Sequence, residues 1–281
     1  MEADDTAASP AMLATYQSLV GALAWLTLTM VPIAVDVAWL QRQTKTPTYG
    51  HIRNANRLLR WIVRNVATLG VRFVKLREPL ELTVISDSAF KALDTKGLVM
   101  RGCVVALREA GELHSGSVCK CMVLDWYSKK HSHVVRSTYA AELHSLLDAI
   151  NQGLVLSYAL TELSIGPQSA RELTKLLEDG VAAVPMTACI DARAVFDNIV
   201  ADVVKTPYDK HLVVHALAVR EFLRLRAIKS LYWIDTEDML ADGLTKGSVD
   251  RTALTVASAE GRWSLAGAEP VRYDESAEVD D

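Results

Sequence analysis

Four acidic residues are the first candidates for chemistry in this sequence. Two of them follow short runs rich in β-branched residues, at 83–87 and 185–191, which predict strands that end in an aspartate. A third lies one turn into a helix expected from residue 137, and the fourth lies in a short helix after a strand-like run at 231–235. Because sites in open α/β sheets form at the carboxyl ends of strands, all four can converge on one pocket. The four residues are Asp87, Glu142, Asp191 and Asp242.

Carboxylates that lie this close repel one another, and near neutral pH divalent cations are the natural way to hold them together. Asp and Glu supply the hard oxygen ligands that Mg²⁺ prefers, and Mn²⁺ can substitute for it. Two such ions about 3.5–4 Å apart activate a water and stabilise the leaving oxygen in phosphodiester cleavage. The competing interpretation is that these four are ordinary solvated members of the 34 acidic residues in the chain.

Short motifs around the acids favour a site. Residues 125–130 read Asp-Trp-Tyr-Ser-Lys-Lys, and residues 137–142 read Ser-Thr-Tyr-Ala-Ala-Glu. Residues 189–191 read Cys-Ile-Asp, and residues 236–246 read Thr-Glu-Asp-Met-Leu-Ala-Asp-Gly-Leu-Thr-Lys. In this order the motifs resemble those of the ribonuclease H domain in copia-type LTR retrotransposons. The segment 236–246 is the most specific match.

The resemblance extends to other parts of the chain. Residues 209–211, Asp-Lys-His, are similar to a further box of the same domain. Residues 16–23, Tyr-Gln-Ser-Leu-Val-Gly-Ala-Leu, are similar to the run that opens the tail of the family's reverse transcriptase. The resemblance therefore covers about residues 16–246 and corresponds to the C-terminal part of a pol polyprotein, with a reverse transcriptase thumb or connection before the ribonuclease H domain. No Tyr-x-Asp-Asp motif is present, so no polymerase active site is expected in this chain.

The resemblance implies a fold, an activity and roles for the acids. The fold would be α/β and ribonuclease H-like, with a mixed five-stranded sheet, flanking helices and a small helical thumb- or connection-like segment ahead of it. Asp87 would bridge two Mg²⁺ ions, Glu142 and Asp191 would hold one of them, and Asp242 the other. The activity would be hydrolysis of the RNA strand of an RNA–DNA hybrid, in which the 2′-hydroxyl marks the RNA.

Three departures support an alternative. The segment 86–90 lacks the second Asp that the family carries beside its first acid, and residues 189–192 read Cys-Ile-Asp-Ala where the family has Cys-Asp-Asn. Cellular ribonucleases H often carry a His ahead of the last acid, and residues 234–242 contain none. The alternative function is a catalytically inactive nucleic-acid-binding remnant, or a co-opted module of the same fold. Retention of all four acids favours the enzyme.

Basic residues suggest where nucleic acid binds. A helix expected over 51–66 places four arginines in one narrow stripe, with apolar residues on the opposite face. Such a stripe suits contacts to a phosphate backbone, although an ordinary solvated face is the competing interpretation. A second group lies in the loop expected ahead of residue 137 and in the 209–211 box. The candidates are Arg53, Arg57, Arg60, Arg64, Ser128, Lys129, Lys130 and Lys210.

Composition divides the 281 residues into four parts, and the net charge of −4 argues against a uniformly basic surface. We expect a disordered acidic leader over 1–11, a helical thumb- or connection-like segment over 12–78, the ribonuclease H-like domain over 80–247 and a flexible acidic tail over 248–281. The four cysteines have no paired spacing, which predicts reduced thiols rather than disulfides or a zinc site.

One apolar stretch is long enough to span a membrane. Residues 19–40 are nearly continuous in apolar character, but Pro32 and Asp36 interrupt them and the preceding residues are acidic. We therefore expect two packed helices here, with a membrane span as the alternative. The expected protein is intracellular, in the cytoplasm or nucleus, and neither secreted nor membrane-spanning. Its expected partners are an RNA–DNA hybrid and, by the resemblance, the remainder of a pol polyprotein.

Overall fold

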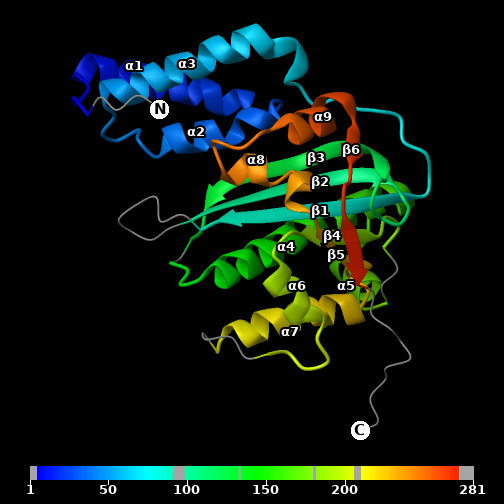
Figure 1. The fold of residues 1–281 in the computed structure, drawn as a ribbon. Helices are drawn as coiled ribbons and strands as arrows, with labels where there is room; N and C mark the ends of the chain where they lie inside the picture. Colours follow the sequence, from blue (N-terminus) through cyan, green and yellow to red (C-terminus); the bar gives the residue numbers. More distant parts are fainter. Residues whose placement is uncertain (1–4, 91–98, 133, 180–181, 206–209, 272–281) are drawn as a thin grey trace.

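The computed structural model describes residues 5–90, 99–132, 134–179, 182–205 and 210–271. A mixed sheet lies at its centre, with strand order β6-β3-β2-β1-β4-β5-β7 (Figure 1). Three consecutive strands pair antiparallel, and two strands that follow helices then add in parallel on the other side of β1. This arrangement confirms the predicted ribonuclease H-like α/β fold. The five predicted strands are β1 (Leu80–Ala89), β2 (Met100–Glu109), β3 (Val118–Lys130), β4 (Met186–Ile190) and β5 (Ser230–Ile234).

The sheet has seven strands, so the predicted number of five is wrong. The two additional strands are short and lie at opposite edges: β6 (Arg262–Ser264) pairs with β3, and β7 (Ala268–Val271) pairs with β5. Their brevity and their mixed polar sequence give no alternation that a pattern search can detect. Each of these strands pairs with an edge strand, β3 or β5, which is available only once the sheet has folded.

Helices cover both faces of the sheet (Figure 1). Side chains from the long helix after β3 and from two later helices form one apolar core with the sheet, and short helices near the C-terminus form a second core on the opposite face. A polar helix, α5 (Ala170–Glu178), follows the long one. The helices of the first core are α4 (Thr138–Ile165), α6 (Arg193–Val200) and α7 (Leu212–Arg224), and those of the second are α8 (Asp242–Thr245) and α9 (Thr252–Glu260).

The apolar stretch 19–40 forms two packed helices, as predicted. The break falls at η1 (Val31–Ile33), where Pro32 separates α1 (Pro10–Leu26) from α2 (Ala34–Gln41). With α3 (Tyr49–Asn65) these helices build a third apolar core, and α3 continues into the short turn η2 (Val66–Thr68). None of the described helices is long and apolar enough to cross a membrane.

The N-terminal helices share a core with the sheet. Val31 and Ala34 belong to the same cluster as Ile85 and Val104 of the central strands. The indole Nε1 of Trp126 on β3 also donates to the Thr27 carbonyl oxygen, at 3.0 Å. The segment before residue 80 is therefore packed onto the ribonuclease H-like domain.

Two of the expected terminal boundaries need correction. Of the expected leader 1–11, residues 1–4 lie outside the described residues, but Ala7 forms a β-bridge with Thr48 and α1 begins at Pro10. The expected flexible tail 248–281 is folded as far as residue 271, and only 272–281 lies outside the described residues. Trp263 and Leu254 are each 1% exposed within the second core, so this segment completes the domain.

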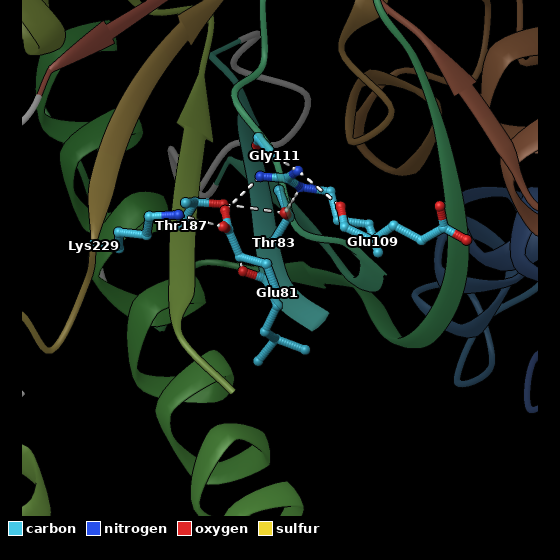
Figure 2. Close-up of polar contacts among 8 residues, drawn as sticks. Glu81, Thr83, Glu109, Gly111, Thr187 and Lys229 are labelled. Atoms are coloured by element: carbon cyan, nitrogen blue, oxygen red, sulfur yellow. Dashed lines mark hydrogen bonds and ion pairs between the residues drawn. The ribbon is translucent and has the colours of Figure 1, made fainter. Parts of the chain in front are cut away.

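A buried ionic network fastens the central strands at the end of β1 remote from Asp87 (Figure 2). Glu81 pairs with the Arg108 guanidinium, and both side chains are almost fully buried. Lys229 Nζ lies 2.8 Å from the other Glu81 oxygen, and Arg108 Nε donates to Thr83 Oγ1 at 2.8 Å. The Thr83 hydroxyl also contacts the Thr187 hydroxyl of β4, at 3.1 Å. Strands β1, β2 and β4 are thus joined by side chains as well as by the backbone.

Substitution of Trp263 tests whether the C-terminal segment belongs to the core. Trp263→Ala removes a buried indole that also donates to the Asp238 carbonyl oxygen, so we expect a loss of about 3–5 kcal/mol in the free energy of unfolding, measured by urea denaturation. Arg262→Ala is the control, since that side chain is exposed in a surface ion pair. If both substitutions lower the free energy of unfolding by the same small amount, the segment is a flexible tail and not part of the core.

Candidate active site

Asp87 lies on the central strand, and β1 is buried on both faces around it. It is only 1% exposed, and in the antiparallel ladder it pairs with Gly102 of β2. A Cβ at Gly102 would lie 2.9 Å from the Ala241 carbonyl oxygen and from the side chains of Leu244 and Thr245. The missing side chain therefore lets α8 approach the sheet beside Asp87.

Glu142 reaches the same place from α4. The hydroxyl of Ser137 caps this helix by accepting from the Ala140 N–H at 3.1 Å, as the Ser-Thr run predicted. One turn later, Ser145 Oγ donates to the Asp87 carbonyl oxygen at 2.9 Å and ties α4 to β1. Farther along, a Cβ at Gly153 would lie 2.4 Å from side-chain atoms of Val84 and Met186, so the glycine lets α4 lie close to the sheet.

Asp191 directly follows β4, the strand that pairs in parallel with β1. Thr236 Oγ1 in η3 (Thr236–Asp238) donates to Asp191 Oδ2 at 3.1 Å, and Trp233 Nε1 donates to the Asp191 carbonyl oxygen at 2.9 Å. One carboxylate oxygen from each of Asp87, Glu142 and Asp191 lies within 4.8 Å of the other two. The structure thus brings three of the four predicted acids together.

Asp242 lies beside this group at the start of α8. Its Oδ1 accepts a hydrogen bond from Lys246 Nζ at 2.5 Å, and the same ammonium lies 3.6 Å from Asp87 Oδ1. The hydroxyl of Thr245 donates to the other Asp87 oxygen. Sequence reasoning included Thr245 and Lys246 in the matched motif but gave them no role. The available signal was the i, i+4 spacing of Asp242 and Lys246 on a helix.

Burial and neighbouring negative charges raise the pKa values of three of these acids. Burial, and then the charge of Asp242, raises the pKa of Asp87 to about 7, although Lys246 and the Thr245 hydroxyl oppose the shift. Burial, followed by the charges of Asp87 and Asp191, raises the pKa of Glu142 to about 9. Burial and then Asp242 also raise the pKa of Asp191. Each shift has the sign expected of carboxylates held together without enough positive charge.

The donor set fits a divalent cation. Glu142 Oε2 is buried and has no hydrogen-bond partner among the described residues, so one carboxylate oxygen of this residue keeps its lone pairs unused. Asp87, Glu142 and Asp191 offer hard oxygen ligands from three separate elements, as Mg²⁺ or Mn²⁺ requires. These three residues could hold such an ion, and Asp242 lies close enough to act on the charges of Asp87 and Asp191.

The predicted nucleic-acid contacts lie in three separate places. The four arginines of α3 are all exposed, and α3 packs on α1 and α2 (Figure 1). They are Arg53, Arg57, Arg60 and Arg64. Lys210 is exposed just before α7.

Ser128, Lys129 and Lys130 do not lie in a loop, which corrects the expectation. They form the end of β3, because the ladder with β2 continues to Lys130 opposite Met100. Ser128 and Lys130 are half-buried there, whereas Lys129 is exposed and its Nζ lies 4.8 Å from the Tyr127 ring centroid. The strand pairing thus leaves Lys129 as the most accessible of the three.

Comparisons with known proteins agree with the motifs. The chain is 27% identical over 238 residues to the retrovirus-related Pol polyprotein from transposon RE1 of Arabidopsis thaliana, and 27% identical over 232 residues to that from transposon RE2. These matches cover 85% and 82% of the chain but only 14% of each relative. No protein-family model matches. The chain therefore resembles one region of retrotransposon pol polyproteins over most of its own length.

Solved structures give weaker likenesses. The N-terminal RNase H domain of a Mycobacterium tuberculosis protein shares 14% identity, covers 64% of this chain and 99% of that chain, and superposes with a TM-score of 0.34. A type 1 RNase H with the type 2 active-site motif shares 13% identity, covers 74% and 84% of the two chains, and gives a TM-score of 0.28. The fold assignment rests instead on the strand order.

The raised pKa values predict how the stability of the metal-free protein depends on pH. Folded Asp87 and Glu142 keep protons that the unfolded chain loses near pH 4, so the folded state binds more protons and ionisation at higher pH destabilises it. Asp87→Asn cannot ionise. Its melting temperature in EDTA, relative to wild type, should therefore rise as pH increases from about 5 to 8.

Asp202→Asn provides the matched control, since Asp202 is exposed and only its backbone oxygen contacts Arg220. The difference between this variant and wild type should stay constant across the same pH range. A constant difference for Asp87→Asn as well would mean that Asp87 carries its charge at all these pH values.

Proposed function

We propose that this chain is a metal-dependent endonuclease that hydrolyses the RNA strand of RNA–DNA hybrids, derived from a copia-type retrotransposon pol polyprotein. The observation that carries the proposal is the group of three carboxylates from β1, α4 and the end of β4, whose ligand oxygens lie within 4.8 Å of one another. It lies in a ribonuclease H-like sheet, and the motifs that supply it are those of the resemblance. An enzyme of this kind would act in the cytoplasm or nucleus, where such hybrids arise.

The proposed cofactor is a pair of Mg²⁺ ions, for which Mn²⁺ can substitute. When bound, they would supply the Lewis acidity that activates water and stabilises the leaving oxygen of the scissile phosphodiester. Asp87 would contact both ions; its membership of the three-carboxylate group and the Lys246 ammonium that it shares with Asp242 support this role. The shape of the site is fixed by the sheet and by α4, so the ligands are positioned before metal arrives.

The proposed partner is the hybrid duplex, together with the remainder of a pol polyprotein. Exposed basic side chains on α3, Lys129 at the end of β3 and Lys210 before α7 are candidates for backbone contacts. Such contacts position a duplex but do not read its sequence. Discrimination of RNA from DNA would rest on the 2′-hydroxyl at the cleaved strand.

The decisive experiment is a cleavage assay on a labelled RNA–DNA hybrid with and without Mg²⁺. We expect wild type to cut the RNA strand only with metal, and Asp87→Asn to abolish cleavage while hybrid binding is retained, because an amide cannot replace the charged ligand. Asp202→Asn should cleave as wild type does. Intact hybrid after incubation of folded wild type with Mg²⁺ or Mn²⁺ would favour the inactive nucleic-acid-binding module.

A second experiment tests the arginine stripe of α3. Replacing Arg53, Arg57, Arg60 and Arg64 together with Gln should weaken hybrid binding and flatten its dependence on salt. Each lost phosphate contact lowers the slope of log affinity against log salt by about 0.9 on duplex DNA, and by less on single strands. Fluorescence anisotropy at several salt concentrations measures this slope. If the variant keeps the wild-type slope, the stripe is a solvated face.

A further inference from the structure

One positive charge lies inside the acidic cluster. The Lys246 ammonium is 2.5 Å from Asp242 Oδ1 and 3.6 Å from Asp87 Oδ1. It thus contacts two of the four carboxylates, Asp87 and Asp242. The proposed reaction gives Lys246 no role. A metal ion bound by Asp87 and Asp242 would use the carboxylate oxygens that the Lys246 ammonium contacts.

The position of Lys246 is built by the fold. Its backbone N–H donates to the Asp242 carbonyl oxygen at 3.0 Å, which closes the single turn of α8 and places both side chains on one face. Gly247 follows Lys246, and its carbonyl oxygen accepts a hydrogen bond from Arg251 at 2.9 Å. Arg251 in turn donates to Asp36 of α2 at 2.5 Å. The chain on either side of Lys246 is therefore held, while its side chain remains 35% exposed.

The partial exposure distinguishes Lys246 from Arg108, the buried cation that pairs with Glu81 of β1. Arg108 is 2% exposed in its pair with Glu81, and it also donates to Thr83 and to the Gly111 carbonyl oxygen, so that it has no path to water. Lys246 can rotate its flexible side chain into solvent, where an ammonium is strongly hydrated. Arg108 is a fixed charge, whereas Lys246 is an exchangeable one.

We propose that Lys246 is a built-in competitor for the second divalent cation, so that the site takes its ions in order. The first ion binds Asp87, Glu142 and Asp191 while Lys246 stays on Asp242. The second ion binds Asp242 and Asp87 only when the ammonium leaves, because both positive charges cannot use the same oxygens. This inference rests on the proposed function, since it requires the cluster to bind divalent cations.

The order of binding can be measured without nucleic acid. Mn²⁺ titrations followed by electron paramagnetic resonance count free and bound ions at one pH. We expect wild type to bind one ion tightly and a second ion more weakly. Lys246→Met should tighten the second ion by about tenfold or more, since a unit charge at contact distance is removed. Lys246→Arg keeps the charge and should stay near wild type, and Lys175→Met, on exposed α5, should match wild type.

A second measurement uses wild-type protein alone. Release of Lys246 by the second ion should expose its amine, so its rate of acylation, read by mass spectrometry relative to Lys175, should rise several-fold at saturating Mg²⁺. Unchanged acylation, or a second Mn²⁺ affinity that is equal in wild type and Lys246→Met, would overturn the inference and leave the proposed function standing. If Asp87→Asn binds Mn²⁺ as wild type does, or if wild type binds none, both this inference and the proposed function are overturned.

Discussion

Strand β1 is buried on both faces, yet it carries a carboxylate near each end. Burial of a charge in a protein interior is costly unless a partner of opposite sign lies beside it, so the fold has to supply positive charge at both places. Near the start of β1 the partner of Glu81 comes from the neighbouring strand β2. Near its end the partners of Asp87 are Thr245 of α8, 158 residues later in the chain, and Lys246, the C-cap of that helix. The position of α8 beside the end of β1 is therefore what gives buried Asp87 a hydroxyl and an ammonium as partners.

The two ends meet this need in different ways, and the difference corresponds to their uses. At Glu81 the charge is met by Arg108 of β2, by Lys229 directly before β5 and by two hydroxyls of the sheet, and both carboxylate oxygens of Glu81 have a partner. At Asp87 one ammonium serves two acids, and Glu142 Oε2 has no partner at all. The first arrangement is complete without any ligand. The second has too little positive charge, and a divalent cation is the group that would complete it.

Sequence patterns predicted the elements whose signals are local and missed those that depend on residues far away in the chain. The β-branched runs before Asp87 and Asp191 are strands, and the break at Pro32 separates two helices, because these signals are local. The strands β6 and β7 are three and four residues long, and Trp263 stands between Arg262 and Ser264. Its burial follows from β3 and α9 being in place, which no local pattern reveals. The role of Lys246 was hidden for the same reason, since its second partner, Asp87, is remote in sequence.

The N-terminal helices show why a boundary read from composition can be misleading. Asp36 interrupts the apolar stretch 19–40, and in the structure it pairs with Arg251, which also donates to the Pro32 and Gly247 carbonyl oxygens. Arg251 therefore links η1 and α2 to the loop that follows Lys246. Because Val31 and Ala34 pack in the same core as Leu244 of α8, a shift of the N-terminal helices would move α8 and with it the ammonium beside Asp87. The helical segment is thus part of the support of the site, and the two predicted domains behave as one structural unit.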